Sequence, residues 1–256
     1  MKVVIDVRFL QTYMLVFLRV GCIVLFAPML GPRGTPWMLK FALTLICTAL
    51  VAPFVPPAPP VRDLLSFGGL VAREAFIGMV LGFSIRLIFG AIQTAGQIIG
   101  YQMGFSMVNL LDPQGHYPIP ILSHFITMLA ILIFLQTNGH HWYLAALVRS
   151  YEVVGMGEAR FSGRLGWELL REGGEMFVAA VKIGFPLLAI IFLFYLVMAL
   201  VARAMPQMNV FIVALPMQVG LGLIVLMLSL PFIASYMEKM FLGLWRELGL
   251  LLKAMG

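Results

Sequence analysis

Residues 176–201 read MFVAAVKIGFPLLAIIFLFYLVMALV, and Lys182 is the single charged residue among them. A helix needs about 20 mainly apolar residues to cross the hydrocarbon core of a bilayer, so this run is long enough to do so. Hydropathy by itself does not distinguish a helix buried in lipid from one buried in protein. The run therefore predicts an all-α protein of the membrane type.

Five further mainly apolar runs lie along the chain, and the one at 119–135 is marginal in length for a membrane span. Segments rich in proline and glycine at 31–36 and 56–60 separate the first three runs, because proline does not continue a helix. No soluble domain interrupts the series, so we predict one polytopic domain of helical hairpins over residues 1–256. The five runs are residues 13–30, 37–55, 75–92, 119–135 and 210–233.

The composition excludes most other classes of protein. Hydrophobic residues make up 62% of the chain and charged residues 11%, less than half of the quarter that is typical of soluble domains. Cys22 and Cys47 lie inside apolar runs, where a thiol usually acts as a small hydrophobe. The net charge of +6 is spread thinly along the chain, which favours an anionic membrane face over nucleic acid.

Basic residues predict the orientation of the spans. In a six-span arrangement, eleven Lys and Arg lie on the side of the two termini and three on the opposite side. Positive charge favours the cytoplasmic side, so we expect both termini there. We expect no cleaved signal, because Arg19 interrupts the first apolar run.

Motifs for catalysis are absent from the sequence. It contains no His-Glu-x-x-His, no phosphate-binding loop and no Gly-x-Ser-x-Gly. His140 and His141 diverge by about 100° on a helix and do not readily share a metal. We therefore expect no catalytic residue, metal or cofactor, and we expect His140 to be a hydrogen-bonded residue at a helix start beside Asn138 and Gly139.

Glycines recur at helical spacing in two places. Gly78 and Gly82 form one pair, and Gly96, Gly100 and Gly104 form a ladder near one helix face. Glycines at this spacing let a second backbone approach closely. The sequence leaves open whether that second backbone belongs to the same chain or to another chain.

The segment 105–113, FSMVNLLDP, follows the glycine ladder and contains no Lys or Arg. It combines methionine with bulky apolar residues and ends at a proline. Because methionine adapts its shape, such a segment is suited to filling an orifice reversibly.

Three basic residues, Arg19, Arg86 and Lys182, lie within apolar runs. An unpaired charge at that depth costs about 2.5–3.5 kcal/mol, so each needs an acid, carbonyl groups, water or a route to the interface. One hypothesis is that they pair with another polypeptide or face a hydrated conduit. The alternative is snorkelling from a tilted helix.

The carboxyl end has a different pattern. Between 235 and 254, apolar residues recur on one helical stripe while the charged residues lie largely away from it. We interpret this segment as an amphipathic helix that docks at a membrane interface or on a partner.

Taken together, several short motifs resemble the FliR/SctT family of type III secretion export-gate proteins. Their order along the chain matches the family over nearly its whole length, and the string Pro-Gln-Met-Asn-Val-Phe favours the flagellar branch. Relatives commonly have a Gly two positions before Pro216 and a Lys two positions after it, where this chain has Ala214 and Gln218. The motifs are Leu18-Arg19-Val20, Ala27-Pro28, Pro36 with Lys40, Gly100 to Gly104 with Asp112-Pro113, Asn138-Gly139-His140, and Arg203 to Phe211 with Pro216.

The resemblance implies a non-enzymatic component of a helical, multi-subunit gate in the bacterial inner membrane, within the flagellar basal body. Its implied partners are FliP and FliQ homologues, FlhB around the gate, FlhA beneath it, and the unfolded flagellar proteins that are exported. It also implies that the hydrophobic hairpins, resembling fused FliP and FliQ folds, are buried largely against partner chains above the normal bilayer plane.

The resemblance assigns roles to individual residues as well. Residues 96–113 match the plug segment of the family, although relatives place Phe where this chain has Met and Leu. The implied seal consists of Met103, Phe105, Met107, Leu110 and Leu111. The implied intersubunit charges are Arg19, Arg86 and Arg203, and the family motif residues are Pro206, Gln207, Asn209, Phe211 and Pro216.

The sequence leaves two alternative functions open. An injectisome protein of the SctT type would share these motifs. A small-molecule secondary transporter would show an inverted repeat with polar, discontinuous helices, and we find no clear repeat in the sequence.

Overall fold

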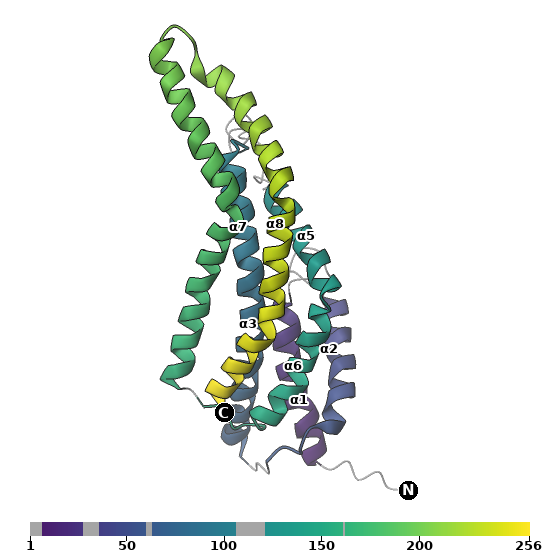
Figure 1. Cartoon of the computed structure of the whole chain (residues 1–256). Helices are drawn as coiled ribbons and strands as arrows, with labels where there is room; N and C mark the ends of the chain where they lie inside the picture. Colours follow the sequence, from purple (N-terminus) through teal and green to yellow (C-terminus); the bar gives the residue numbers. More distant parts are fainter. Residues whose placement is uncertain (1–6, 28–35, 60–62, 106–120, 161) are drawn as a thin grey trace. The chain divides into compact units, whose positions relative to one another are not determined.

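The computed structural model describes residues 7–27, 36–59, 63–105, 121–160 and 162–256. Within these residues all regular secondary structure is helical, as the sequence predicts (Figure 1). The elements are α1 (Val7–Phe26), α2 (Trp37–Val51), the 3-10 helix η2 (Ala52–Phe54), α3 (Leu64–Gln102), α5 (Ile121–Gln136), α6 (Gly139–Val153), α7 (Gly163–Ala204) and α8 (Val210–Met255).

The chain divides into two compact units. The first unit contains Met1–Ile88, Asn138–Gly173 and Phe241–Gly256, and the second contains Phe89–Thr137 and Gly174–Met240. Three of the four boundaries fall inside the continuous helices α3, α7 and α8, and the fourth lies between α5 and α6. No break in composition and no linker marks the three boundaries inside helices, so the sequence pattern does not reveal them.

In the first unit, α1 packs along α2 (Figure 1). Leu15 and Val16 of α1 are fully buried, as are Ile77 of α3 and, nearly, Leu147 of α6. Pro53 ends the regular helix of α2, because its ring removes a backbone donor, and the chain becomes extended at Val55.

In the second unit, α5 packs on the last part of α3. The rings of Phe89 and Phe134 meet edge to face with centroids 5.8 Å apart, and both are buried. The arms of α7 and α8 form a hairpin (Figure 1), and the turn between them is closed by the Met208 N–H, which donates to the Met205 carbonyl.

Five helical segments in the described part of the chain are long and apolar enough to cross a membrane: α1, α2 together with η2, α3, α7 and α8. The predicted run at 119–135 becomes α5, which has only 16 residues and meets this criterion only together with α6. The chain is therefore a membrane-type protein with five such helices, or six if α5 and α6 count as one broken span.

The predicted amphipathic helix at 235–254 is the continuous end of α8 rather than a separate element. Its apolar stripe is covered: Phe241, Leu244, Leu248 and Leu251 are each at most 3% exposed. Within the first unit, Trp245 contacts Trp142 of α6 with ring centroids 5.5 Å apart. The stripe is thus used within the chain, which corrects the expectation that a membrane interface or a partner would cover it.

Candidate functional site

A buried ion pair joins α1 to α3 in the first unit. Arg19 and Glu74 are both 0% exposed, and the Arg19 guanidinium makes two parallel bonds to the carboxylate, from Nε to Oε2 at 2.7 Å and from Nη2 to Oε1 at 3.0 Å. Bidentate pairing of this kind is stronger and more directional than a single charged contact.

The remaining donors of Arg19 go to α6 and to the residue after it. Nη1 donates to Ser150 Oγ at 3.0 Å, and Nη1 and Nη2 each reach the Val154 carbonyl at 3.4 Å. The Tyr151 ring lies 3.9 Å from the guanidinium carbon. All five N–H donors of Arg19 are therefore used within the chain, which corrects the expectation of an intersubunit partner for this residue.

The same carboxylate also fixes the loop that follows α6. Glu74 Oε1 accepts the Gly157 N–H at 2.9 Å, and Arg73 Nη1 donates to the Gly157 carbonyl at 2.6 Å. Gly157 has a positive φ of 77°, a conformation that glycine adopts without a steric penalty. One polar cluster thus ties α1, α3 and α6 together.

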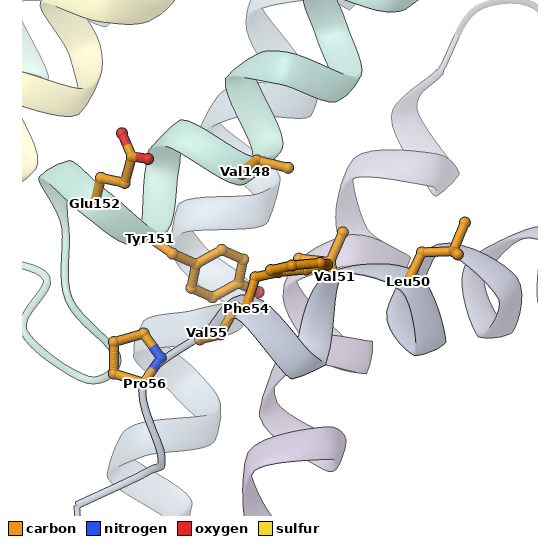
Figure 2. A pocket seen from close by; sticks show the side chains of 8 residues that line it. All are labelled: Leu50, Val51, Phe54, Val55, Pro56, Val148, Tyr151 and Glu152. Atoms are coloured by element: carbon orange, nitrogen blue, oxygen red, sulfur yellow. The ribbon is translucent and has the colours of Figure 1, made fainter.

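An open apolar pocket of about 660 Å³ lies beside this cluster. Figure 2 shows Tyr151 and Val148 of α6 facing Phe54 and Val51 across it. The lining residues offer one carboxylate, Glu152, and no nucleophile paired with a base, so the pocket has no groups arranged for covalent catalysis.

Gly78 and Gly82 let α1 approach α3. A Cβ at position 78 would lie 2.5 Å from the Arg19 carbonyl oxygen, and one at 82 would lie 2.6 Å from Phe26 Cβ. The neighbour of this glycine pair is therefore a helix of the same chain, and the close approach brings Arg19 within reach of Glu74.

The second glycine series divides into three different environments. A Cβ at Gly96 would lie 2.5 Å from the Ser123 Cα of α5, whereas one at Gly100 would meet nothing closer than Leu122 at 3.9 Å. Only Gly96 therefore supports a close backbone approach, and the predicted ladder is not a uniform packing face.

Gly104 has a different role, because it ends α3. Its φ is +83°, its N–H donates to the Tyr101 carbonyl, and the Phe105 N–H donates to the Gly100 carbonyl. These two bonds define a Schellman cap, in which glycine supplies the left-handed residue.

The end of α3 is also held from α8. Gln218, 5% exposed, donates from Nε2 to the Gln102 carbonyl and to the Tyr195 hydroxyl, the latter at 2.8 Å. Met103 is fully buried and lies against Gly222. Neither Tyr195 nor Gly222 stands out in the sequence, because aromatic and small residues are common in the apolar runs that contain them. For Gln218, the sequence does contain a signal: a polar Gln in a run as apolar as 210–233 indicates a residue with a hydrogen-bond partner.

The structure places only part of the predicted seal. Met103 is buried within the second unit, which corrects its assignment to a channel surface, and Phe105 is half-buried. Met107, Leu110 and Leu111 lie outside the described residues.

The other basic residues that the sequence singles out are exposed. Arg86 is exposed on α3, 5.8 Å from the Phe26 ring, and Arg203 is exposed in the last turn of α7. Lys182 is exposed on α7. These three side chains stand on helix surfaces, whereas Arg19 is in the interior.

The family motif residues lie at the tip of the hairpin. Pro206, Gln207 and Asn209 are exposed in the turn between α7 and α8, while Phe211 and Pro216 belong to the first turns of α8. Pro216 stands two residues before Gln218, so the motif leads directly into the segment that contacts the end of α3.

The histidine expectation needs correction. Asn138 adopts a positive φ of 55° at the start of α6 and makes no side-chain cap, and His140 Nδ1 is buried without a hydrogen-bond partner among the described residues. Within those residues no group of three or more His, Cys, Asp or Glu is placed to hold a metal ion.

Comparison with known proteins identifies the family. The family described as "Bacterial export proteins, family 1" matches residues 10–244. The chain is 31% identical to the flagellar biosynthetic protein FliR of Escherichia coli K12 over 233 residues, which are 91% of this chain and 89% of that protein. It is 30% identical to the FliR of Bacillus subtilis 168, covering 90% of both chains, and 31% identical to that of Aquifex aeolicus VF5, covering 91% of both. The chain therefore belongs to bacterial export proteins, family 1, the family of FliR.

Proposed function

We propose that this chain forms part of the channel of the flagellar type III export gate and supplies a plug that blocks ions while unfolded flagellar subunits wait to pass. Membership of the FliR family makes it a membrane-embedded component of the flagellar export apparatus. The finer assignment, to a channel and its plug, is our inference, and so is the absence of enzymatic activity.

The observation that carries the proposal is the apolar surface of the hairpin in the second unit. Phe185 is 63% exposed and Leu200 69% exposed on α7, and Met227 and Leu228 are 73% and 75% exposed on α8. Exposed apolar patches of this kind mark contact with lipid or protein. Among the described residues, these four side chains remain exposed.

The hairpin is longer than the bilayer core is thick, so partner proteins, and not only lipid, must cover its apolar surface. The arm 174–204 of α7 is about 45 Å long at 1.5 Å per residue, whereas the hydrocarbon core of a bilayer is about 30 Å thick. Exposed apolar residues run from Phe177 to Met205. We infer that FliP and FliQ homologues cover the part of the hairpin beyond the bilayer core of the inner membrane, with FlhB and FlhA homologues as further neighbours.

Arg86 and Arg203 fit the same arrangement. Each is an exposed cation on or at the end of an apolar helix, where an unpaired charge in lipid is unfavourable. We assign them to intersubunit contacts with acidic or carbonyl groups of the partner chains.

The seal is assigned to Phe105, Met107, Leu110 and Leu111, and Met103 is placed beneath it as an anchor. Apolar side chains close a pore by excluding water, and opening it then needs only their displacement. The chain's own chemistry supplies no energy for that step.

The test uses the complete gate purified with its partner chains and reconstituted into planar bilayers. Replacing Met107, Leu110 and Leu111 together with Gly should raise ion conductance while the complex still assembles. Unchanged conductance in an assembled complex would remove the plug assignment. Copurification with flagellar basal-body components, rather than with injectisome components, tests the flagellar assignment separately.

A further inference from the structure

Gln218 stabilises the last turn of α3 by using a carbonyl that the helix leaves unpaired. The last four carbonyl groups of a helix accept no hydrogen bond from an N–H group of the same helix. The Gln102 carbonyl is one of these four in α3. Because a carbonyl only accepts, the amide nitrogen of Gln218 must face it, and the same nitrogen also donates to Tyr195 Oη. One buried amide thus connects α3, α7 and α8 within the second unit.

Gly222 contacts the same turn because its lack of a side chain leaves room for Met103. It lies four residues after Gln218, hence on the same face of α8. A Cβ at position 222 would lie 2.6 Å from Met103 Cγ and 2.8 Å from Met103 Cε. The Met103 side chain, 0% exposed, therefore rests directly on the backbone of α8.

The cap at Gly104 completes this attachment. The nearest atoms to a Cβ at Gly104 are Leu215 Cδ2 at 3.5 Å and Gln218 Nε2 at 3.6 Å. The chain therefore leaves α3 at a residue that is capped by its own backbone and lies against α8.

We propose that Gln218 and Gly222 are positioning residues that hold the exit of α3 against α8 and so keep the gate closed. This rests on the proposed function, because the segment to which we assign the seal begins at that exit. Neither residue needs to touch the exported protein. Loss of the Gln218 donor or displacement of Met103 frees the exit and favours the open state.

The first comparison changes the donor at position 218 in the complete gate. Gln218→Met has a similar length and no donor, and it should raise the ion leak about tenfold, the effect expected for losing one to two hydrogen bonds. Gln218→Lys restores an N–H donor on a longer side chain, and it should leave the leak within about twofold of the wild type. A purely structural role predicts a lower yield of assembled complex for Gln218→Met. It also predicts that the Lys variant does not restore a low leak.

The second comparison changes two glycines of the same helix. Gly222→Ala should raise the leak because it displaces Met103, whereas Gly220→Ala should not, because nothing lies within 4 Å of a Cβ there. Both changes replace Gly by Ala in α8, so they share the same gain in helix propensity. This pair keeps the proposal testable even if Gln218→Met fails to assemble.

The outcomes separate this proposal from the proposed function. Equal leak in Gln218→Met, Gly222→Ala and the wild type overturns the positioning role, even when the triple Gly variant at 107, 110 and 111 leaks. A leak in Gln218→Met together with a tight triple variant supports the positioning role and moves the seal to other residues.

Discussion

The guanidinium of Arg19 and the carboxylate of Glu74 face each other in a bidentate pair, 2.7 Å apart at the shorter contact, with neither residue exposed. The pair joins residues 55 positions apart in the sequence. Because its remaining donors and acceptors also hold α6 and Gly157, it is the polar centre of the first unit.

Removing one member of this pair should be much more damaging than removing both. Arg19→Met leaves Glu74 buried without its counter-charge, which costs about 3–5 kcal/mol. The double variant Arg19→Met with Glu74→Met should recover part of that loss. The free energy of unfolding of the chain in detergent, measured as a double-mutant cycle, gives the coupling.

Arg73→Met serves as a control, because its hydrogen bond to the Gly157 carbonyl lies at the edge of the cluster. Its effect should be smaller than that of Arg19→Met. Additive losses in the Arg19 and Glu74 cycle would contradict a coupled pair.

Gly96→Ala should destabilise the second unit, whereas Gly100→Ala should not. The new Cβ at 96 would meet the Ser123 backbone at 2.5 Å, and overpacking of this kind costs about 1–3 kcal/mol. At 100 the nearest atoms are 3.9 Å away, so the gain in helix propensity of about 1 kcal/mol dominates. Thermal unfolding of the two variants should shift in opposite directions, and equal shifts would argue against a close approach of α3 and α5.

Gly104→Ala should cost about 1–2 kcal/mol, because its φ of +83° is unfavourable for a residue with a Cβ. Gly104→Asn should cost less, since Asn tolerates the left-handed conformation. The midpoint of denaturant unfolding measures both. A loss in the Asn variant as large as in the Ala variant would point to steric contact with Leu215 as the cause, rather than backbone strain.

Arg86→Gln should reduce copurification of the partner chains and leave the stability of the isolated chain nearly unchanged, because Arg86 is exposed and has no ion pair among the described residues. Lys182→Gln is the matched control: that cation is also exposed on an apolar helix, and its long side chain is suited to snorkelling. Intact assembly and export in the Arg86 variant would defeat the intersubunit role.

The sequence determined the fold class and the family of this protein. Apolar runs such as 176–201 are driven out of water, so they are buried in lipid or in protein. Backbone N–H and C=O groups find no water there, and within a single apolar run a helix pairs them internally. The spacing of Gly78 and Gly82 also indicated a close helix contact. Neither pattern contains the identity of the neighbour, which for this pair is α1 of the same chain.

Tertiary structure alone decided which polar groups meet. Arg19 finds Glu74, Ser150 and the Val154 carbonyl, and Gln218 finds Gln102 and Tyr195, through contacts between residues distant in sequence. Periodicity encodes only the face on which a side chain lies, whereas hydrogen bonding depends on the angle and separation of packed helices. For the same reason the sequence shows the apolar stripe of the carboxyl-terminal helix. It does not show that residues of the same chain bury this stripe.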